Sequence, residues 1–140
     1  MLAATRPRTA VFDIEDAAGI TKPKTIAQLT EYLAAKLTQS AGFNVVPRDQ
    51  LRSRLAAEKR KSYKDCYKQR CQIELGKAMA AQKSLATKLL RIGGQCAFTS
   101  LLYDLKSETT DRAASAKTAC SESALLSGID ELAKQLAAPK

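Results

Sequence analysis

Apolar residues follow two different periods along this chain, and segments of the two kinds alternate. In four segments the apolar residues recur every three or four positions, a spacing that predicts amphipathic helices. Between these segments lie short runs rich in β-branched, aromatic and leucine residues. These runs predict strands at residues 9–14, 43–46, 84–90, 95–105 and 111–120. The chain is therefore predicted to contain both helices and strands in one continuous alternation.

Capping residues mark where the predicted helices begin and end. Thr25 and Asp49 are suited to be the N-caps of the first two helices, and Ser121 that of the last. Gly42 ends the first helix, and the third is a short helix after Cys71. The predicted buried stripes are Ile26, Leu29, Leu33 and Leu37 in the first helix, Leu51 and Leu55 in the second, Ile73, Leu75, Ala78 and Met79 in the third, and Leu125, Leu126, Ile129, Leu132, Ala133 and Leu136 in the last. We expect the last stripe to cover one face of the sheet.

The order of these elements, β-α-β-α-α-β-β-β-α, predicts an α/β fold. We expect a single three-layer domain over residues 9–138, with a mixed five-stranded sheet between helices. Right-handed helical crossovers make the first three strands parallel. Gly93 and Gly94 form a two-residue hairpin turn, so the fourth strand runs antiparallel to the third. Residues 1–8 are predicted to be a tail outside the domain.

The composition excludes several kinds of catalytic and binding site, because the residues and motifs that they need are absent from the sequence. The chain has 140 residues, no histidine and a net charge of +9. Without histidine, neither a Ser-His-Asp nor a Cys-His catalytic arrangement can be built, and the commonest metal ligand is missing. The sequence has no glycine-rich nucleotide-binding motif and no apolar run near the roughly 20 residues of a membrane helix. We expect a protein that is not an enzyme and that carries no metal and no cofactor.

Four cysteines, Cys66, Cys71, Cys96 and Cys120, form an even set. If the last two strands pair around a turn centred near residue 108, Cys96 lies directly opposite Cys120. A disulfide there would contribute about 3 to 3.5 kcal/mol. Cys66 and Cys71 are close in sequence, and a bridge between them would close a small loop. Four reduced thiols, a zinc site and a redox-active Cys66–Cys71 pair are the alternatives.

Positive charge is concentrated between residues 48 and 70. This segment holds nine basic and three acidic residues, a net +6 out of +9 for the whole chain, and two tyrosines lie among the cations. Such a surface suits an acidic protein or an anionic envelope component, with the tyrosines as anchors. The predicted partner-binding residues are Arg52, Lys59, Arg60, Lys61, Tyr63, Lys64, Tyr67, Lys68 and Arg70. A solvated helix face and a nucleic-acid surface are the alternatives.

Three carboxylates, Asp13, Glu15 and Asp16, follow the first predicted strand. This is a position where α/β sheets often bind ligands. We expect a loop and helix-cap surface there, and the alternative is a site that binds a cation or orients a partner.

Three stretches together resemble a known domain family. They are FNVVPRDQLRSRLAAE (residues 43–58), CQIELGKAMAAQKSL (residues 71–85) and LLYDLKSETTD (residues 101–111). Over roughly residues 9–136 the chain resembles the domain shared by CsgG-like, LpoB-like and TolB amino-terminal proteins. Gly76 stands where the family helix has its glycine, and Asp104 where the penultimate strand has an aspartate. The chain departs from the family pattern at Lys88 or a neighbour, where a glycine is usual, and at the turn 107–110, which lacks glycine.

The resemblance implies a cell-envelope location and a non-enzymatic role, as an adaptor, a lipoprotein activator or a secretion-channel component. The fold is also similar to the anticodon-binding domain of some tRNA synthetases. We expect the protein to be periplasmic or held in the envelope as a lipoprotein, because its cysteines suit an oxidising compartment. Leu2, Ala3 and Ala4 resemble the end of a leader cut before Thr5. The alternative is a cytoplasmic nucleic-acid-binding module that uses the basic segment 48–70.

Overall fold

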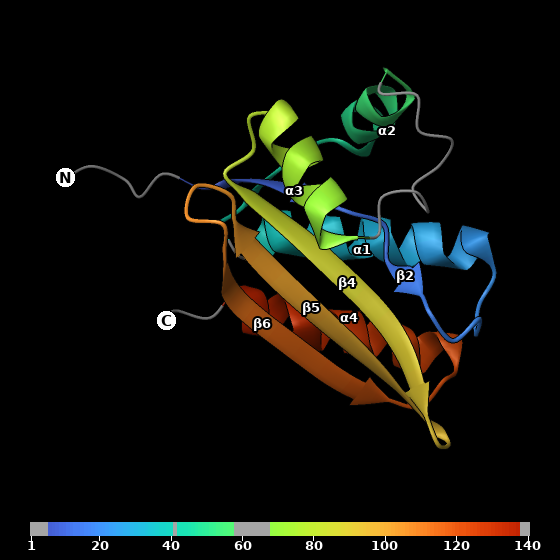
Figure 1. The fold of residues 1–140 in the computed structure, drawn as a ribbon. Helices are drawn as coiled ribbons and strands as arrows, with labels where there is room; N and C mark the ends of the chain where they lie inside the picture. Colours follow the sequence, from blue (N-terminus) through green and yellow to red (C-terminus); the bar gives the residue numbers. More distant parts are fainter. Residues whose placement is uncertain (1–5, 41, 58–67, 138–140) are drawn as a thin grey trace.

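A computed structural model describes residues 6–40, 42–57 and 68–137 of this chain (Figure 1). In chain order its elements are β1 (Arg8–Val11), β2 (Glu15–Asp16), α1 (Pro23–Ser40), β3 (Asn44–Val45), α2 (Arg48–Ala57), α3 (Gln69–Ala78), β4 (Lys83–Ile92), β5 (Gln95–Asp104), β6 (Thr109–Thr118) and α4 (Glu122–Ala137). The predicted succession of helices and strands is confirmed, with β2 as one additional short strand.

The strands form one mixed, open sheet in the order β3-β1-β4-β5-β6, and β2 also pairs with β4. β1 is parallel to both β3 and β4, whereas β5 is antiparallel to β4 and to β6. The predicted mixed α/β sheet is therefore confirmed. The predicted first strand, residues 9–14, is interrupted after Val11. The reason is that the N–H of Ile14 bonds to Oγ1 of Thr30 in α1 (3.1 Å) instead of to a strand.

The larger core lies between the sheet and helices α1 and α4, which cover one of its faces (Figure 1). Leu85 and Leu89 of β4 and Phe98 of β5 are fully buried there. The predicted stripes of both helices line this core: Ile26, Leu29, Leu33, Leu37, Leu125, Ile129, Leu132, Ala133 and Leu136. Leu126 is the exception at 41% exposed, because successive helix positions are turned about 100° apart. Its predicted place in the stripe is therefore wrong.

A smaller core lies on the opposite face of the sheet, under α2 and α3. On α3 the buried positions are Cys71, Gln72, Leu75 and Gly76, with Met79 just after the helix. These positions share one face at 3.6 residues per turn. The predicted stripe is correct for Leu75 and Met79. Ile73 is half-buried and packs against this core, whereas the prediction is wrong for Ala78, which is exposed.

Two helices begin earlier than their predicted caps. α1 begins at Pro23, not after Thr25, and α2 begins at Arg48, not after Asp49. A proline opens α1 and another precedes α2, and the fixed φ of proline suits the first helical turn. Ser121 is the N-cap of α4 as predicted, since its Oγ accepts a hydrogen bond from the backbone N–H three residues later (3.3 Å).

The predicted Cys96–Cys120 disulfide is present, with 5.3 Å between the two Cα atoms. The register predicted for it is wrong, because Cys96 pairs in the ladder with Thr118 and not with Cys120. The turn lies at residues 105–108, and a β-bulge between Leu102 and Tyr103 interrupts the ladder. The bridge therefore ties the beginning of β5 to the segment just beyond the end of β6.

The outer edge of β6 is closed by a side chain of α4. Gln135 donates a hydrogen bond from Nε2 to the carbonyl of Ser115 (2.8 Å) and accepts one at Oε1 from its N–H (3.0 Å). These are the two bonds that a neighbouring strand would make to the same residue. Arg112 of β6, next to the β-bulge, donates a hydrogen bond from Nη1 to the carbonyl of Leu136 in α4 (2.9 Å). The last turn of α4 is thus joined to the edge strand.

We expect Ile129→Ala to lower the free energy of unfolding by about 2 to 5 kcal/mol, because the side chain is 0% exposed and its loss leaves a cavity. Leu126→Ala, three positions earlier on the exposed side of α4, is the matched control and should change stability by less than about 0.5 kcal/mol. Urea unfolding of both variants measures the difference. Equal effects would show that α4 does not bury its predicted stripe.

We expect Gln135→Ala to open the edge of β6. The amide of Ser115 should then exchange with solvent deuterium faster, and the protein should associate more strongly at high concentration, because an unpaired edge accepts another strand. Lys134→Ala, a neighbouring exposed position, is the control. Hydrogen exchange and sedimentation test the two effects, and an unchanged Ser115 exchange rate would contradict the role given to Gln135.

Candidate partner-binding surface

The predicted basic surface falls largely outside the described residues. Lys59, Arg60, Lys61, Tyr63, Lys64, Cys66, Tyr67 and the side chain of Arg52 all lie there. Cys71, the predicted partner of Cys66, is disulfide-bonded. Lys68 and Arg70 are described and exposed at the start of α3, where Arg70 Nε lies 3.3 Å from Glu74 Oε1. The predicted surface and the Cys66–Cys71 pairing therefore stay predictions.

Arg48, the first cation of the basic segment, belongs to the interior of the fold. Its Nη2 lies 2.7 Å from Oδ1 of Asp13, and its Nη1 lies 3.1 Å from Oε1 of Glu31. The Arg48 and Asp13 side chains are only 13% and 14% exposed, so they are protected from solvent screening. This pair joins α2 to the segment after β1. Neither charge is available to a partner, and Asp13 is mostly buried instead of lying on the expected loop surface.

The other two carboxylates after β1 act locally. Asp16 accepts hydrogen bonds from the backbone N–H groups of Ile20 (3.1 Å) and Thr21 (2.9 Å), which shapes the loop before α1. Glu15 lies 3.8 Å from the ammonium of Lys88. Within residues 6–40, 42–57 and 68–137, no group of three or more histidines, cysteines, aspartates or glutamates is placed to hold a metal ion.

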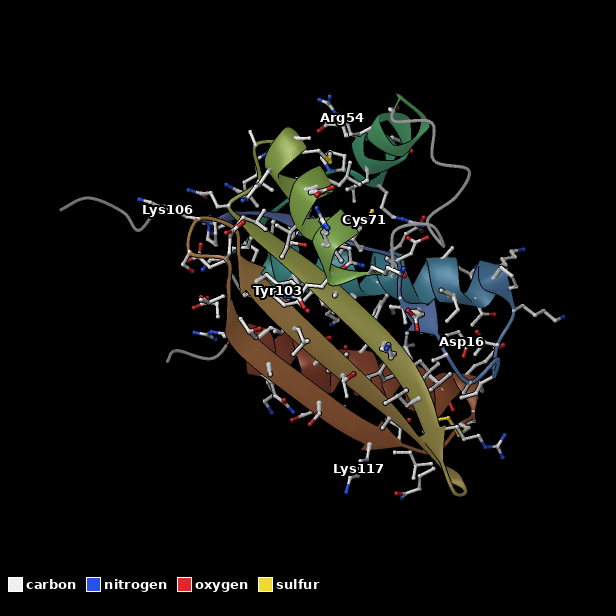
Figure 2. All side chains as sticks on the ribbon, viewed as in Figure 1. Asp16, Arg54, Cys71, Tyr103, Lys106 and Lys117 are labelled. Carbon is white, nitrogen blue, oxygen red and sulfur yellow. A yellow bond between two sulfur atoms is a disulfide. The ribbon has the colours of Figure 1, made fainter. Side chains whose placement is uncertain are left out.

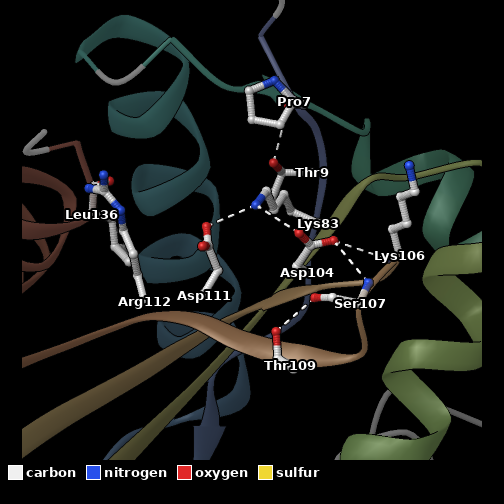
Figure 3. Close-up of polar contacts among 10 residues, drawn as sticks. All are labelled: Pro7, Thr9, Lys83, Asp104, Lys106, Ser107, Thr109, Asp111, Arg112 and Leu136. Atoms are coloured by element: carbon white, nitrogen blue, oxygen red, sulfur yellow. Dashed lines mark hydrogen bonds and ion pairs between the residues drawn. The ribbon is translucent and has the colours of Figure 1, made fainter. Parts of the chain in front are cut away.

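Asp104, the aspartate on which the family resemblance partly rests, shapes the turn between β5 and β6 (Figure 3). Its Oδ1 accepts hydrogen bonds from the backbone N–H groups of Lys106 (2.9 Å) and Ser107 (3.5 Å). The Nζ of Lys83 lies 3.7 Å from Oδ2 of Asp104 and 2.8 Å from Oδ2 of Asp111. The Lys106 hydrogen bond is the main cause that lowers the pKa of Asp104 from its ordinary value, and Ser107 and Lys83 add to it. The role of this aspartate is therefore structural.

Gly76 of α3 has a packing role of the same kind. A Cβ at this position would come within 2.7 Å of Cδ1 of Leu105 and 3.7 Å of Cβ of Ser84. The glycine therefore lets α3 approach the sheet closely, next to the turn that Asp104 shapes. Gly76 and Asp104 therefore both have structural roles where α3 meets the sheet and the β5–β6 turn.

The half of the sheet that α3 leaves uncovered is the largest feature that the sequence did not predict. Figure 1 shows α3 lying across one half of this face, while the ends of β4, β5 and β6 near the β4–β5 hairpin have no described element above them. The strand pairing places three rows of residues side by side there. We call this the open sheet face: Ala86, Lys88, Leu90, Ile92, Gln95, Ala97, Thr99, Leu101, Ala113, Ser115 and Lys117.

The open sheet face combines exposed apolar side chains with positive charge. Ile92 is 73% exposed and Leu101 is 38% exposed, and they are two of the three large apolar residues exposed in the described chain. Lys88 is half exposed, and Lys117 extends from β6 into solvent (Figure 2). Ile92 stands at the hairpin end of this face and Leu101 at the α3 end, with the half-buried Leu90 and Ala97 between them. Apolar surface exposed on one face is typical of interaction sites.

A cleft of about 260 Å³ lies where the open sheet face meets α3. Its lining includes Gln72 of α3 and Thr99, Leu101 and Tyr103 of β5. Gln72 is 2% exposed, and its Oε1 accepts no hydrogen bond from the residues that the structure describes. Burial also raises the pKa of Tyr103. A buried amide oxygen without a donor is costly, and a bound molecule could supply the donor.

The alternation along β4 is the signal that could have revealed the open sheet face. The strand predicted at residues 84–90 was expected to be buried, with no distinction between its two sides. In the structure, Leu85 and Leu89 face the α1–α4 core, whereas Lys88 and Leu90 face the other way. A lysine beside the buried leucine of a central strand predicts that one side of the strand lacks a complete cover.

Known structures share this fold, although no protein-family model and no curated sequence matches the chain. Lipoprotein GNA1162 from Neisseria meningitidis matches with a TM-score of 0.67 and 14% identity, over 81% of this chain and 80% of that one. The LpoB C-terminal domain from Escherichia coli matches at 0.64 and 14%, over 85% and 87%. TolB from Acinetobacter baumannii matches at 0.51 and 12%, over 84% of this chain and 24% of that one.

The LpoB-like and TolB-like parts of the predicted resemblance are therefore confirmed at the level of the fold. The CsgG-like part stays a prediction. No helix in the described part of the chain has the length and apolar character needed to cross a membrane.

We expect Asp104→Asn to reveal the charge of this residue through the pH dependence of stability. Asparagine keeps an oxygen for the Lys106 N–H but removes the charge. The pKa of Asp104 is lower in the folded protein than the ordinary value of an aspartate, so the parent should be the more stable protein at neutral pH. That advantage should shrink as the pH falls below about 4 through the folded-state pKa.

Urea unfolding at neutral and acidic pH measures the effect of Asp104→Asn. Ser107→Ala is the control, because it changes the same turn without changing a charge. Its difference from the parent should be the same at each pH. A difference between parent and Asp104→Asn that stays constant with pH would contradict the electrostatic role of Asp104.

Proposed function

We propose that this chain is a non-enzymatic, protein-binding domain of the bacterial cell envelope, located in the periplasm or carried there as a lipoprotein. The observation that carries the proposal is the fold, which matches a Neisseria lipoprotein and the LpoB C-terminal domain over more than four-fifths of this chain. The Cys96–Cys120 disulfide supports it, since such bonds persist in oxidising compartments.

The electrostatics favour an acidic partner. The chain carries a net charge of +9, and the described cations Lys68 and Arg70 stand exposed at the start of α3. We propose that they belong to the predicted binding surface with Arg52, Lys59, Arg60, Lys61, Tyr63, Lys64 and Tyr67. Complementary charge would steer an acidic protein, or an anionic envelope component, toward this side of the domain.

The test compares two charge-reversed variants in capture experiments from a bacterial envelope extract. The first variant is Arg60→Glu, Lys61→Glu, Lys64→Glu, with Lys68→Glu and Arg70→Glu added. The control is Lys24→Glu with Lys134→Glu, which reverses charges on the α1–α4 layer. We expect the first variant to lose the captured proteins, the control to retain them, and both to keep a thermal midpoint near that of the parent.

A labelled single-stranded oligonucleotide tests the nucleic-acid alternative in the same buffers. Binding of nucleic acid would show a steep linear dependence of log affinity on log salt, with a slope near −0.7 per neutralised phosphate. Binding of a protein partner would depend on salt only modestly. Steep oligonucleotide binding together with no captured envelope protein would overturn the proposal.

A further inference from the structure

No described element covers the open sheet face, although it exposes apolar side chains. On the opposite face, α1 and α4 enclose Leu85, Leu89 and Phe98 completely. On the open face, Leu101 is exposed on the central strand β5, and Ile92 is exposed at the last position of β4, beside the hairpin turn. Packing a second layer on such a face would remove apolar surface from water at about 25 cal/mol per Å².

The dimensions of the open sheet face fit one helix. Three strands at about 4.8 Å spacing and seven residues at about 3.3 Å per residue give a surface of about 14 by 23 Å. An α-helix is about 10–12 Å wide, and 15 residues of it span about 22 Å. A stable interface between globular domains needs about 800 Å² on each side, which is more than twice the area of this face.

The side chains on the open face also suit a helix. Alanine, serine and threonine dominate its middle and its β6 side, so little stands above the backbone at Ala97, Thr99, Ala113 and Ser115. α3 already lies on the same face of the sheet and shows that a helix packs there (Figure 1). A partner helix would continue the layer that α3 begins.

The charges on the open face favour an acidic partner over a second copy of this chain. The face contains Lys88 and Lys117 and no acidic residue, and Glu15 stands at its margin, 3.8 Å from Lys88. Two copies of this chain placed face to face would oppose lysines to lysines, which disfavours self-association through this surface. A partner with carboxylates beside its apolar residues would instead complement the lysines on β4 and β6.

The cleft beside α3 adds a polar requirement. Gln72 Oε1 is buried at its wall without a donor from the described residues. A helix end brings free backbone N–H groups, and polar side chains near that end bring further donors. A partner that reaches from the apolar rows into the cleft would satisfy this oxygen.

We propose that the open sheet face docks a single amphipathic helix from a partner protein, with an apolar stripe flanked by glutamate or aspartate. The inference rests on the proposed function, because it names the element of the partner that this domain binds. Leu90, Ile92, Leu101 and the alanines receive the apolar stripe. Lys88 and Lys117 pair with the acidic flanks, and Gln72 accepts a hydrogen bond at the α3 end.

A display library of helices tests the proposal without knowledge of the natural partner. Peptides of about 18 residues, long enough for five turns, carry a fixed leucine and alanine stripe. Each flanking position is randomised between glutamate, glutamine and lysine. We expect selection on the oxidised protein to enrich glutamate at the flanks. The amide resonances of residues 88–92, 95–101 and 113–117 should shift when a selected peptide binds.

Charge-swapped variants supply the decisive comparison. Lys88→Glu with Lys117→Glu should weaken a selected acidic peptide by about tenfold or more, and a repeated selection should enrich lysine instead. The control Lys24→Glu with Lys134→Glu has the same net charge and should change affinity by less than about twofold. Thermal unfolding of each variant shows that the fold is intact. Thr99→Arg, which places a bulky charge in the middle row, should abolish binding of the acidic peptide.

The outcomes separate this inference from the proposed function. Enrichment of lysine flanks, no enrichment at all, or resonance shifts confined to other surfaces would overturn the inference. So would binding of phosphatidylglycerol vesicles that depends on Lys88 and Lys117 while no acidic helix is selected. Capture of envelope proteins that survives both Lys88→Glu with Lys117→Glu and Thr99→Arg would also overturn it, while leaving the proposed function standing.

Discussion

The ladder between β4 and β5 is the interaction on which the rest of the structure depends. It runs the full length of both ten-residue strands, from Lys83 opposite Asp104 to Ile92 opposite Gln95. The two-residue Gly93–Gly94 turn fixes its register. A slip of one residue would exchange the two faces, and lysine would enter the α1–α4 core. The α1–α4 core and the open sheet face both follow from this one alignment.

The sequence predicted the structure best where apolar residues recur regularly over many positions and a capping residue or a turn marks the end of the element. α4 was predicted almost residue by residue, because Ser121 sets its start and its stripe repeats over four turns. The antiparallel hairpin was predicted because two adjacent glycines leave few alternatives. The Cys96–Cys120 disulfide was predicted correctly from a strand register that is wrong by two residues. The error did not exclude the bond, because a disulfide tolerates a range of Cα separations.

The errors have a common physical origin in contacts between distant segments. Nothing near Arg48 in sequence shows that Asp13 and Glu31 will enclose it. Likewise, the early end of β1 depends on Thr30 of α1, which captures the N–H of Ile14. The open sheet face was not predicted, because the position of α3 over the sheet depends on contacts between residues that are distant in the sequence. Of the predicted binding residues, Lys68 and Arg70 lie in the described part of the chain and are exposed, and their role in binding stays a prediction.

The Cys96–Cys120 bond also determines how this domain would carry mechanical load. Tension applied through α4 reaches the sheet at Cys120 and crosses the bridge directly to Cys96 at the start of β5. The chain between the two cysteines, separated by 24 positions, is bypassed, so about 80 Å of backbone length cannot be pulled out. Two of the three strands of the open sheet face lie within that covalent loop. A molecule seated on them would therefore pull on a surface that unravelling from the carboxyl end cannot peel away.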